Sequence, residues 1–325
     1  KITENEDSAL FSAAIAGFLP TLFSTNSFGP LTLFLPLVFL NIYAFMNIKQ
    51  SANLYVYLVT FLLLSLTSSA TFLLIIGFSI YILLSYAEGK RFNRSEIELI
   101  IFSLFFFVWL QFIFFKDIFL SQGIGFIWQN VPTKIISQYF PQVSIFDALL
   151  AISIIPFLAG IFVVYRSLFE LKGLKSFLLI SLAISTTLLA WFKLIEFNLA
   201  LSFFGIILAI LFSMFYQETI NYIKDTKLAH LKKYFITTTI LLLLFSTVYP
   251  AVITALQQNT PTDEEIDAFS WLAANTAEDS TVMALLEEGH LVTYYGKRKN
   301  VMDSQFGLVK DVDERLAALQ SLHKT

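Results

Sequence analysis

The 325-residue sequence contains no cysteine, only three histidines and few charged residues. Without cysteine the chain has neither disulfides nor thiolate metal ligands, so any part outside a membrane is held by packing alone. Charged residues make up 14% of the chain, well below the roughly 25% of an ordinary soluble domain. Neither a G-x-G-x-x-G nor a Walker pattern occurs, which gives a soluble nucleotide-binding protein no support.

Long apolar segments dominate residues 1–256. The chain is 57% hydrophobic with 36 phenylalanines, and its mean hydropathy is +0.73. Crossing the roughly 30 Å hydrocarbon core of a bilayer takes about 17 to 25 apolar residues. The break at Thr67–Thr71 either separates two spans or kinks one long helix. The sequence predicts a polytopic α-helical membrane protein with about nine spans: Ser8–Phe23, Pro30–Met46, Leu54–Thr67, Ala70–Tyr86, Leu99–Phe115, Phe146–Tyr165, Phe177–Trp191, Leu199–Tyr216 and Phe235–Leu256.

Basic residues alternate between the connecting loops. They gather in Glu88–Glu96, Arg166–Lys175 and Gln217–Tyr234, whereas Lys116–Ile145 and Phe192–Asn198 contain few. Cytoplasmic loops carry the excess of lysine and arginine, so the three basic loops are expected on the inner side of a cell membrane. With an odd number of spans, the chain after the last span is expected on the extracytoplasmic side.

The tail, residues 257–325, differs in character from the membrane part, residues 1–256. It holds six basic and twelve acidic residues, which gives nucleic-acid binding no support. Thr262 and Glu265 form a capping box before a helix whose apolar stripe includes Trp271, so Trp271 is expected to be buried. Strand-like runs follow at Thr281–Leu286 and Leu291–Tyr295. With a further helix near its end, the tail predicts the start of an extracytoplasmic α/β domain.

The stretch Ala268–Asp303, AFSWLAANTAEDSTVMALLEEGHLVTYYGKRKNVMD, follows the last predicted span. With its W-L, N-T, glycine motif, basic turn and Val-x-Asp, it resembles the start of the exported domain of GT-C membrane glycosyltransferases, above all the catalytic subunit of oligosaccharyltransferase. The resemblance implies thirteen spans, of which those predicted here would be the fifth to the thirteenth. It also implies a chain truncated at both ends, and a substrate-binding outer loop at Lys116–Ile145.

The chain departs from this family at several motifs. The family's acceptor-recognising WWDYG aligns with Ala284–Gly289, which reads Ala-Leu-Leu-Glu-Glu-Gly, and Lys116–Ile145 contains no glutamate. Where the family places an arginine that binds the donor phosphate, this chain offers Lys193, Glu196 and Asn198. Lysine can bind a phosphate as a point charge, without the bidentate fork of arginine. The family's catalytic, metal-binding acids sit in a first outer loop, which is not part of this sequence, so catalytic residues remain unassigned.

Each candidate site also has a purely structural interpretation. Lys193 and Glu196 suit a donor-phosphate site at a membrane edge, or reach the lipid headgroups from a helix end. A polar turn in the tail could bind an acceptor, a sugar or a cation, or could simply be a solvated turn. It consists of Glu287, Glu288, Gly289 and His290. The outer loop has aromatic and amide side chains, which are expected either to line a groove for a sugar or lipid or to lie on the membrane surface. They are Trp128, Asn130 and Tyr139.

The resemblance implies a membrane glycosyltransferase that moves a sugar or oligosaccharide from a polyprenyl-phosphate donor to a protein or lipid acceptor on the outer face. A divalent cation, Mg²⁺ or Mn²⁺, is expected from the same resemblance, with ligands outside this sequence. A true oligosaccharyltransferase for protein N-glycosylation is one alternative. A polytopic transporter or a flippase for lipid-linked saccharides is another, although the sequence lacks the internal symmetry that transporters tend to show.

Overall fold

A computed structural model describes residues 6–23, 30–122, 144–227, 229–256, 261–303 and 311–322. The chain divides into two compact units, which are described separately. The membrane unit comprises Lys1–Ile113 and Val143–Gln258, and the tail unit comprises Phe114–Gln142 and Asn259–Thr325.

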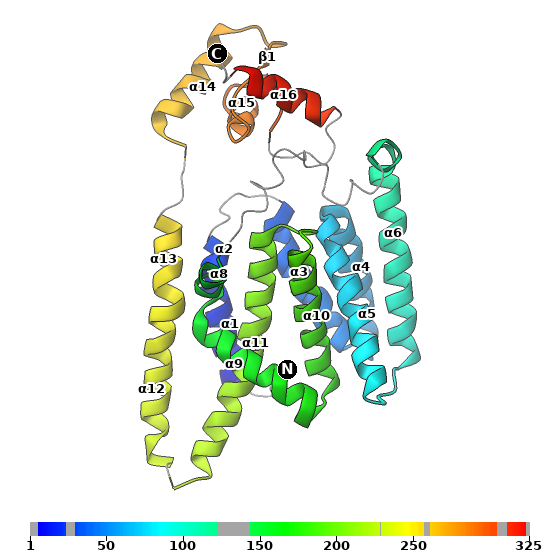
Figure 1. Ribbon diagram of the computed structural model, residues 1–325, viewed down its shortest axis with the longest axis vertical. Coiled ribbons are helices and arrows are strands. Elements are labelled where there is room, and N and C mark those ends of the chain that lie inside the picture. Colours follow the sequence, from blue (N-terminus) through cyan, green and yellow to red (C-terminus); the bar gives the residue numbers. More distant parts are fainter. Residues whose placement is uncertain are drawn as a thin grey trace. The chain divides into compact units, whose positions relative to one another are not determined.

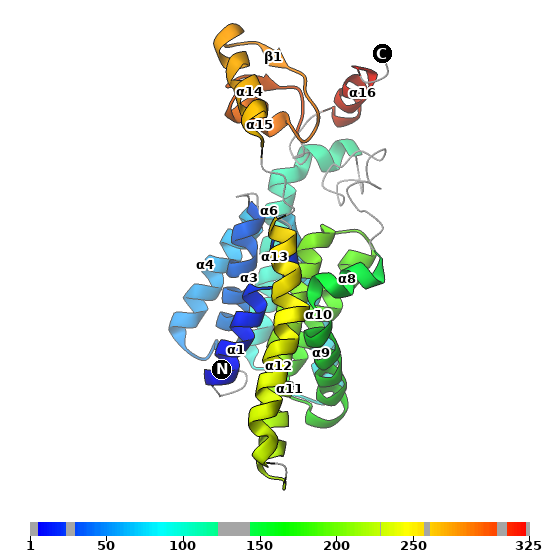
Figure 2. The same ribbon diagram turned by 90° about the vertical axis from the view of Figure 1, so that its left-hand side faces the viewer.

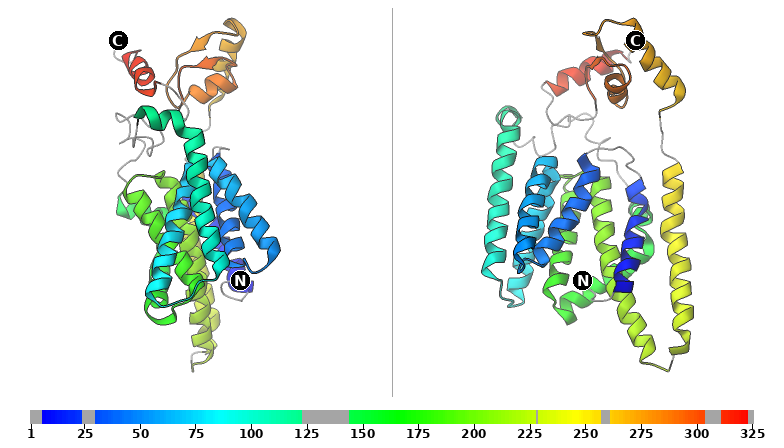
Figure 3. Two further views of the ribbon diagram at one scale, coloured as in Figure 1. Left: turned by 90° about the vertical axis from the view of Figure 1, so that its right-hand side faces the viewer. Right: turned by 180° about the vertical axis from the view of Figure 1, so that it is seen from behind.

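Helices make up the described part of the membrane unit, and Figure 1 labels most of them. Helix α5 packs along α10, α3 along α4, and α9 along α11. Seen from behind in Figure 3, α1 lies along α11. The α-helices are α1 (Glu6–Gly17), α2 (Pro20–Phe23), α3 (Pro30–Met46), α4 (Ser51–Thr67), α5 (Phe72–Ala87), α6 (Arg94–Gln122, which continues into the tail unit), α8 (Ile145–Ile152), α9 (Ile154–Arg166), α10 (Leu174–Trp191), α11 (Phe197–Lys224), α12 (Lys232–Leu243) and α13 (Tyr249–Leu256).

Short 3-10 and π segments join or extend several of these helices. They are η1 (Ser69–Thr71), η3 (Ser167–Leu171), η4 (Ala229–Leu231) and η5 (Leu244–Val248). At the predicted break, Ser68 is extended with φ −156° and accepts a hydrogen bond from the Ala70 N–H. The Thr71 hydroxyl donates to the Leu64 carbonyl at 2.8 Å. These contacts separate α4 from α5, so the two are not one kinked helix.

Six of the described helical segments are long and apolar enough to cross a membrane. Two shorter apolar helices, Thr32–Met46 and Ser51–Thr67, accompany them. The protein is therefore a polytopic helical membrane protein, while the total of nine spans stays a prediction. The six are Ser69–Ala87, Arg94–Phe114, Ile154–Leu171, Leu174–Trp191, Phe197–Lys224 and Ala229–Leu256.

Small residues allow the membrane helices to approach closely. A Cβ added to Gly77 of α5 would lie 2.5 Å from a methyl group of Leu182 on α10, and one added to Gly160 of α9 would lie 2.6 Å from Leu208 on α11. The Ser185 hydroxyl of α10 also donates to a backbone carbonyl of α5 at 2.8 Å. Lipid tails are as apolar as leucine, so close packing and such hydrogen bonds, rather than hydrophobic burial, hold these helices together.

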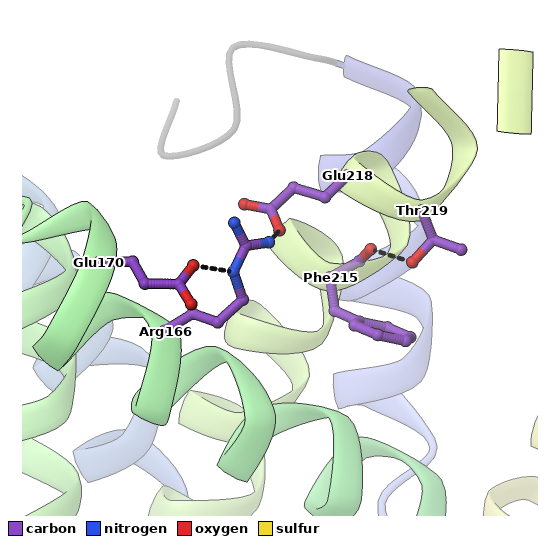
Figure 4. Close-up of polar contacts among 5 residues, drawn as sticks. All are labelled: Arg166, Glu170, Phe215, Glu218 and Thr219. Carbon is purple, nitrogen blue, oxygen red and sulfur yellow. Dashed lines mark hydrogen bonds and ion pairs between the residues drawn. The ribbon is translucent and has the colours of Figure 1, made fainter. Parts of the chain in front are cut away.

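Ion pairs join helix ends at all three basic loops. Figure 4 shows Arg166, at the end of α9, between Glu170 of the same segment and Glu218 on α11. The Arg166 Nε lies 2.8 Å from Glu170 Oε2. The Lys172 Nζ lies 2.6 Å from Glu88 Oε2, at the end of α5. Partly exposed pairs of this kind contribute about 1 kcal/mol or less each, so they align helix ends more than they stabilise the fold.

The described tail unit contains three further helices and one short parallel strand pair. These are α14 (Asp263–Asn275), β1 (Thr281–Val282), α15 (Gly289–Tyr294), β2 (Lys299–Asn300) and α16 (Val312–Leu322). The two strands pair in register Thr281 with Lys299 and Val282 with Asn300. Figure 2 shows α14, β1 and α15 close together. A small core gathers Met302, Val312, Leu316 and Leu319.

Two expectations about the tail are wrong, while its capping box is confirmed between Thr262 and Glu265. Leu291–Tyr295 was expected as a strand but falls largely in α15, where Val292 is fully buried. So short an apolar run fits either period, and packing of this turn against Met302 and Asp303 selects the helix.

The second correction concerns Trp271, whose side chain is 61% exposed rather than buried. Helix α14 is held instead by Arg298, which is only 6% exposed. Its Nη2 donates to the carbonyl oxygens of Ala273 and Thr276, each at 2.6 Å, and its Nε donates to Thr276 Oγ1 at 2.8 Å. The guanidinium satisfies carbonyls that the helix end leaves without partners.

Candidate functional site

Two adjoining cavities open within the membrane unit, between α1, α3 and α11. The first, here called the Glu196 cavity, has a volume of about 360 Å³ and lies near the turn that joins α10 to α11. Its walls are mostly apolar and come from three segments of the chain. They are Ala16, Gly17 and Leu22; Thr32, Leu35, Pro36 and Phe39; and Glu196, Leu199, Ser202 and Ile206.

The second cavity, here called the Lys175 cavity, has a volume of about 860 Å³. It shares Ala16, Pro36, Phe39 and Ile206 with the Glu196 cavity, so the two cavities adjoin. Its far end is formed by Lys175, near the start of α10, and Asn47, just after α3. The other residues lining it are Ala9, Ser12, Ala13, Ile42, Tyr43, Met46, Leu179, Ile210 and Ser213.

Glu196 is the one charged residue among the described residues that line the Glu196 cavity. It is the N-cap of α11, but its side chain accepts no hydrogen bond from the first turn of that helix. Partial burial raises the pKa of its carboxyl above the usual value of 4.5. With the described residues its carboxylate forms no ion pair or hydrogen bond. Desolvation without compensation costs stability, and such groups are often retained for binding or catalysis.

Lys193, by contrast, has a clear structural task. Its φ of +55° is left-handed, its N–H donates to the Ala190 carbonyl at 3.0 Å, and the Leu194 N–H donates to the Leu189 carbonyl at 2.8 Å. This is the Schellman arrangement that ends many helices, and here it ends α10. The Lys193 side chain is exposed and does not line the cavity, and neither does that of Asn198. Of the three expected phosphate-site residues, the structure thus brings only Glu196 to a cavity.

In the polar turn of the tail, some of the expected site residues also have structural roles. Gly289 is buried, and Asn300 Nδ2 donates to its carbonyl at 2.9 Å and to Asp303 Oδ2 at 3.1 Å. His290 Nδ1 lies 3.6 Å from Asp303 Oδ2 and is about half exposed. Glu288 Oε2 accepts a hydrogen bond from the Leu285 N–H at 3.2 Å, which fixes the turn. Glu287 is simply exposed.

Two further expectations cannot be placed on the described residues. The outer-loop residues Trp128, Asn130 and Tyr139 lie outside them. Within the described part of the chain, no group of three or more histidine, aspartate or glutamate side chains could hold a metal ion. The ligands of the divalent cation were expected outside this sequence, so the cation stays an expectation. The described residues do not form a site for it, and no chemical step is derived through one.

One polar feature inside the membrane unit escaped the sequence analysis. Ser153 separates α8 from α9 with φ +78° and is fully buried. Its hydroxyl lies 2.7 Å from that of Thr247 and 3.1 Å from that of Ser246, both in the π segment η5. Pro156, in the first turn of α9, was the available signal, because proline favours the start of a helix and lacks an N–H for the preceding turn.

Comparisons with known proteins give likenesses to solved structures, and two of these follow. No family model and no curated protein matches the sequence. The oligosaccharyltransferase AglB from Archaeoglobus fulgidus, solved with an inhibitory peptide and a dolichol-phosphate, is similar with a TM-score of 0.48 at 15% identity, covering 89% of this chain and 41% of that one. The Archaeoglobus fulgidus oligosaccharyltransferase tethered to an acceptor peptide with an NVT sequon has a TM-score of 0.47 at 14% identity, covering 93% and 42%.

The chain spans less than half the length of these two structures. Their TM-scores and identities are too low to transfer an activity, a substrate or a site residue to this chain. What this chain does is therefore argued from its own residues.

Proposed function

We propose that this chain belongs to a membrane glycosyltransferase, which transfers a sugar or oligosaccharide from a polyprenyl-phosphate donor to a protein or lipid acceptor. The observation that carries the proposal is the Glu196 cavity: an apolar space at one end of the membrane helices, with a single desolvated carboxylate in its wall. An isoprenoid chain needs apolar walls, and the sugar next to its phosphate needs a hydrogen-bond acceptor at the cavity mouth.

The charges of the side chains determine which role is proposed for each. A carboxylate repels a phosphate, so Glu196 accepts hydrogen bonds from sugar hydroxyls rather than binding the phosphate itself. Lys193, three residues earlier and exposed, is the cation available to pair with the phosphate, and Asn198 supplies a neutral amide at the same edge. In the tail, the pair of His290 with Asp303, supported by Gly289 and Glu288, is proposed to meet the acceptor.

Donor turnover by the purified full-length protein tests this assignment. Radiolabelled polyprenyl-phosphate sugars are supplied, and loss of label from the organic phase is followed, so the acceptor need not be known. Glu196→Gln should lower kcat/KM at least about tenfold, since hydrogen bonds to charged groups are worth roughly 1.5–3 kcal/mol. Glu98→Gln, an exposed carboxylate of α6 paired with Arg94, is the matched control. Equal turnover by both variants would contradict the role of Glu196.

Lys193 is tested separately with the same donor. Lys193→Gln should raise the apparent KM about tenfold, which is roughly 1.4 kcal/mol, and Lys193→Arg should retain binding because it keeps the charge. An unchanged KM in Lys193→Gln would leave Lys193 with only its role in ending α10.

The proposal places the α10–α11 turn and the tail on the extracytoplasmic side. Because the chain has no native cysteine, single cysteines report topology without background. A cysteine at Ser280 should react with an impermeant maleimide in sealed cells, and one at Asn93 should not. Reaction at Asn93 would reverse the orientation and with it the proposed face of transfer.

A transporter or flippase is the second candidate, and one observation favours it. Interrupted membrane helices are typical of transport sites, and α8 and α9 are interrupted at Ser153 opposite the π segment η5. Proteoliposomes with a fluorescent lipid-linked sugar separate the two functions. Movement of the intact lipid between leaflets without loss of its sugar would support the transporter. Protein N-glycosylation remains the finer enzymatic alternative, to be distinguished by transfer to an asparagine-containing peptide.

A further inference from the structure

We infer that the Lys175 cavity binds one anionic phospholipid of the leaflet next to the basic loops, with the lipid phosphate at Lys175 and an acyl chain along α1, α3 and α11. The inference concerns a second site, at the end opposite to Glu196. It does not depend on the proposed transferase activity.

The lining of the cavity is polar at one end and apolar along the rest, as a lipid is. Lys175 ends the basic loop Arg166–Lys175, and Asn47 lies just after α3. Tyr43 adds a phenol one helical turn before Asn47, and its backbone carbonyl accepts a hydrogen bond from Asn47 Nδ2 at 2.8 Å. Ser12 and Ser213 have hydroxyls, but both donate to backbone carbonyls, at 2.7 Å and 2.6 Å, and so present little polarity to a ligand. The remaining lining residues are all apolar.

The depth of the cavity matches one leaflet. Pro36 lies at its apolar end and Asn47 at its polar end, eleven residues apart along α3 and the turn that follows it. At about 1.5 Å per residue this is roughly 16 Å, close to half of the roughly 30 Å hydrocarbon core. An acyl chain that enters beside Lys175 therefore ends near Phe39, where the Glu196 cavity begins.

Charge selects the headgroup. Lys175 is the only charged residue among the described residues that line this cavity, and it is exposed. A cation at headgroup level attracts an anionic lipid with about 1 kcal/mol per lysine, or roughly fivefold in affinity. A zwitterionic lipid gains less, because its own cationic group opposes the lysine.

The test is photo-crosslinking of the full chain in phosphatidylcholine vesicles. The probe is phosphatidylglycerol with a diazirine on its acyl chain, and a phosphatidylcholine probe with the same chain measures selectivity. Crosslinked peptides should map to α1 and α3. Lys175→Gln should reduce phosphatidylglycerol labelling about fivefold, whereas Lys227→Gln, which removes an exposed charge from the nearby loop after α11, should leave it unchanged.

A second pair of variants tests the cavity itself. Ala13 lines it and the neighbouring Ala14 does not, and both are exposed on α1. Ala13→Phe should nearly abolish labelling of α1 and α3, and Ala14→Phe should not. Equal labelling by both lipid probes, an equal effect of Lys175→Gln and Lys227→Gln, or no label on α1 and α3 would each overturn the inference. The last outcome would mean that something other than a lipid, such as polypeptide, fills the space.

Discussion

Gly289→Ala is expected to loosen the tail unit, because this glycine allows two backbone segments to touch. A Cβ at position 289 would lie 2.5 Å from the Met302 carbonyl oxygen, 2.7 Å from the Asp303 Cβ and 3.0 Å from the Asp303 Cα. Non-bonded carbon atoms prefer about 3.5–4.0 Å. The nearest atom is backbone, so no change of side-chain rotamer relieves the clash.

The size of the effect follows from two opposing terms. Forcing an extra methyl group into a packed site costs about 1–3 kcal/mol. Alanine regains up to about 1 kcal/mol over glycine in a helix interior, and less at position 289, which opens the short helix α15. A net loss of about 1–2 kcal/mol is expected. Met302 belongs to the small core with Val312 and Leu316, so the shift should spread to α16.

Trypsin cleavage after Arg298 in the full chain measures this loss. Arg298 is 6% exposed and its guanidinium is bound to α14, so cleavage there requires local opening. A loss of about 1.4 kcal/mol corresponds to roughly tenfold faster cleavage. Gly17→Ala, where an added Cβ meets nothing within 4 Å, should not change the rate. Cleavage after Arg298 at the wild-type rate in Gly289→Ala would refute the reasoning.

Three further predictions concern single side chains. Lys193→Gly removes the ammonium but suits the left-handed turn, so its free energy of unfolding should exceed that of Lys193→Ala by about 1 kcal/mol and its melting temperature should be higher. Equal melting temperatures would exclude a backbone role. Burial raises the pKa of Glu196, so stability from its neutral form is present below pH 4.5 and is lost as the pH rises through the folded-state pKa. The melting temperature of Glu196→Gln relative to wild type should therefore rise towards neutral pH. A difference in melting temperature that does not depend on pH would contradict this. Trp271→Ala should change tail proteolysis little because Trp271 is exposed, whereas strongly faster digestion would show that it is packed.

Features that depend on neighbouring residues in the chain were predictable. The apolar segments were predictable as membrane helices, because they are long enough to cross a bilayer as helices and a helix satisfies its own backbone polar groups in lipid. The capping box of Thr262 and Glu265 formed as expected, since both partners lie within one helical turn. The loop pattern also indicated where helices end, and the ion pairs of Arg166 and Lys172 lie at such ends.

What the sequence by itself determined is thus the membrane class, most helix positions and the local caps, all of which follow from the properties of short segments. Only the tertiary structure decided which side chains meet: that Glu196 rather than Lys193 faces a cavity, that Arg298 rather than Trp271 is buried against α14, and that Leu291–Tyr295 is mostly helical. These outcomes depend on contacts between residues distant in the chain. Such contacts exceed the small local preferences of a short run of residues.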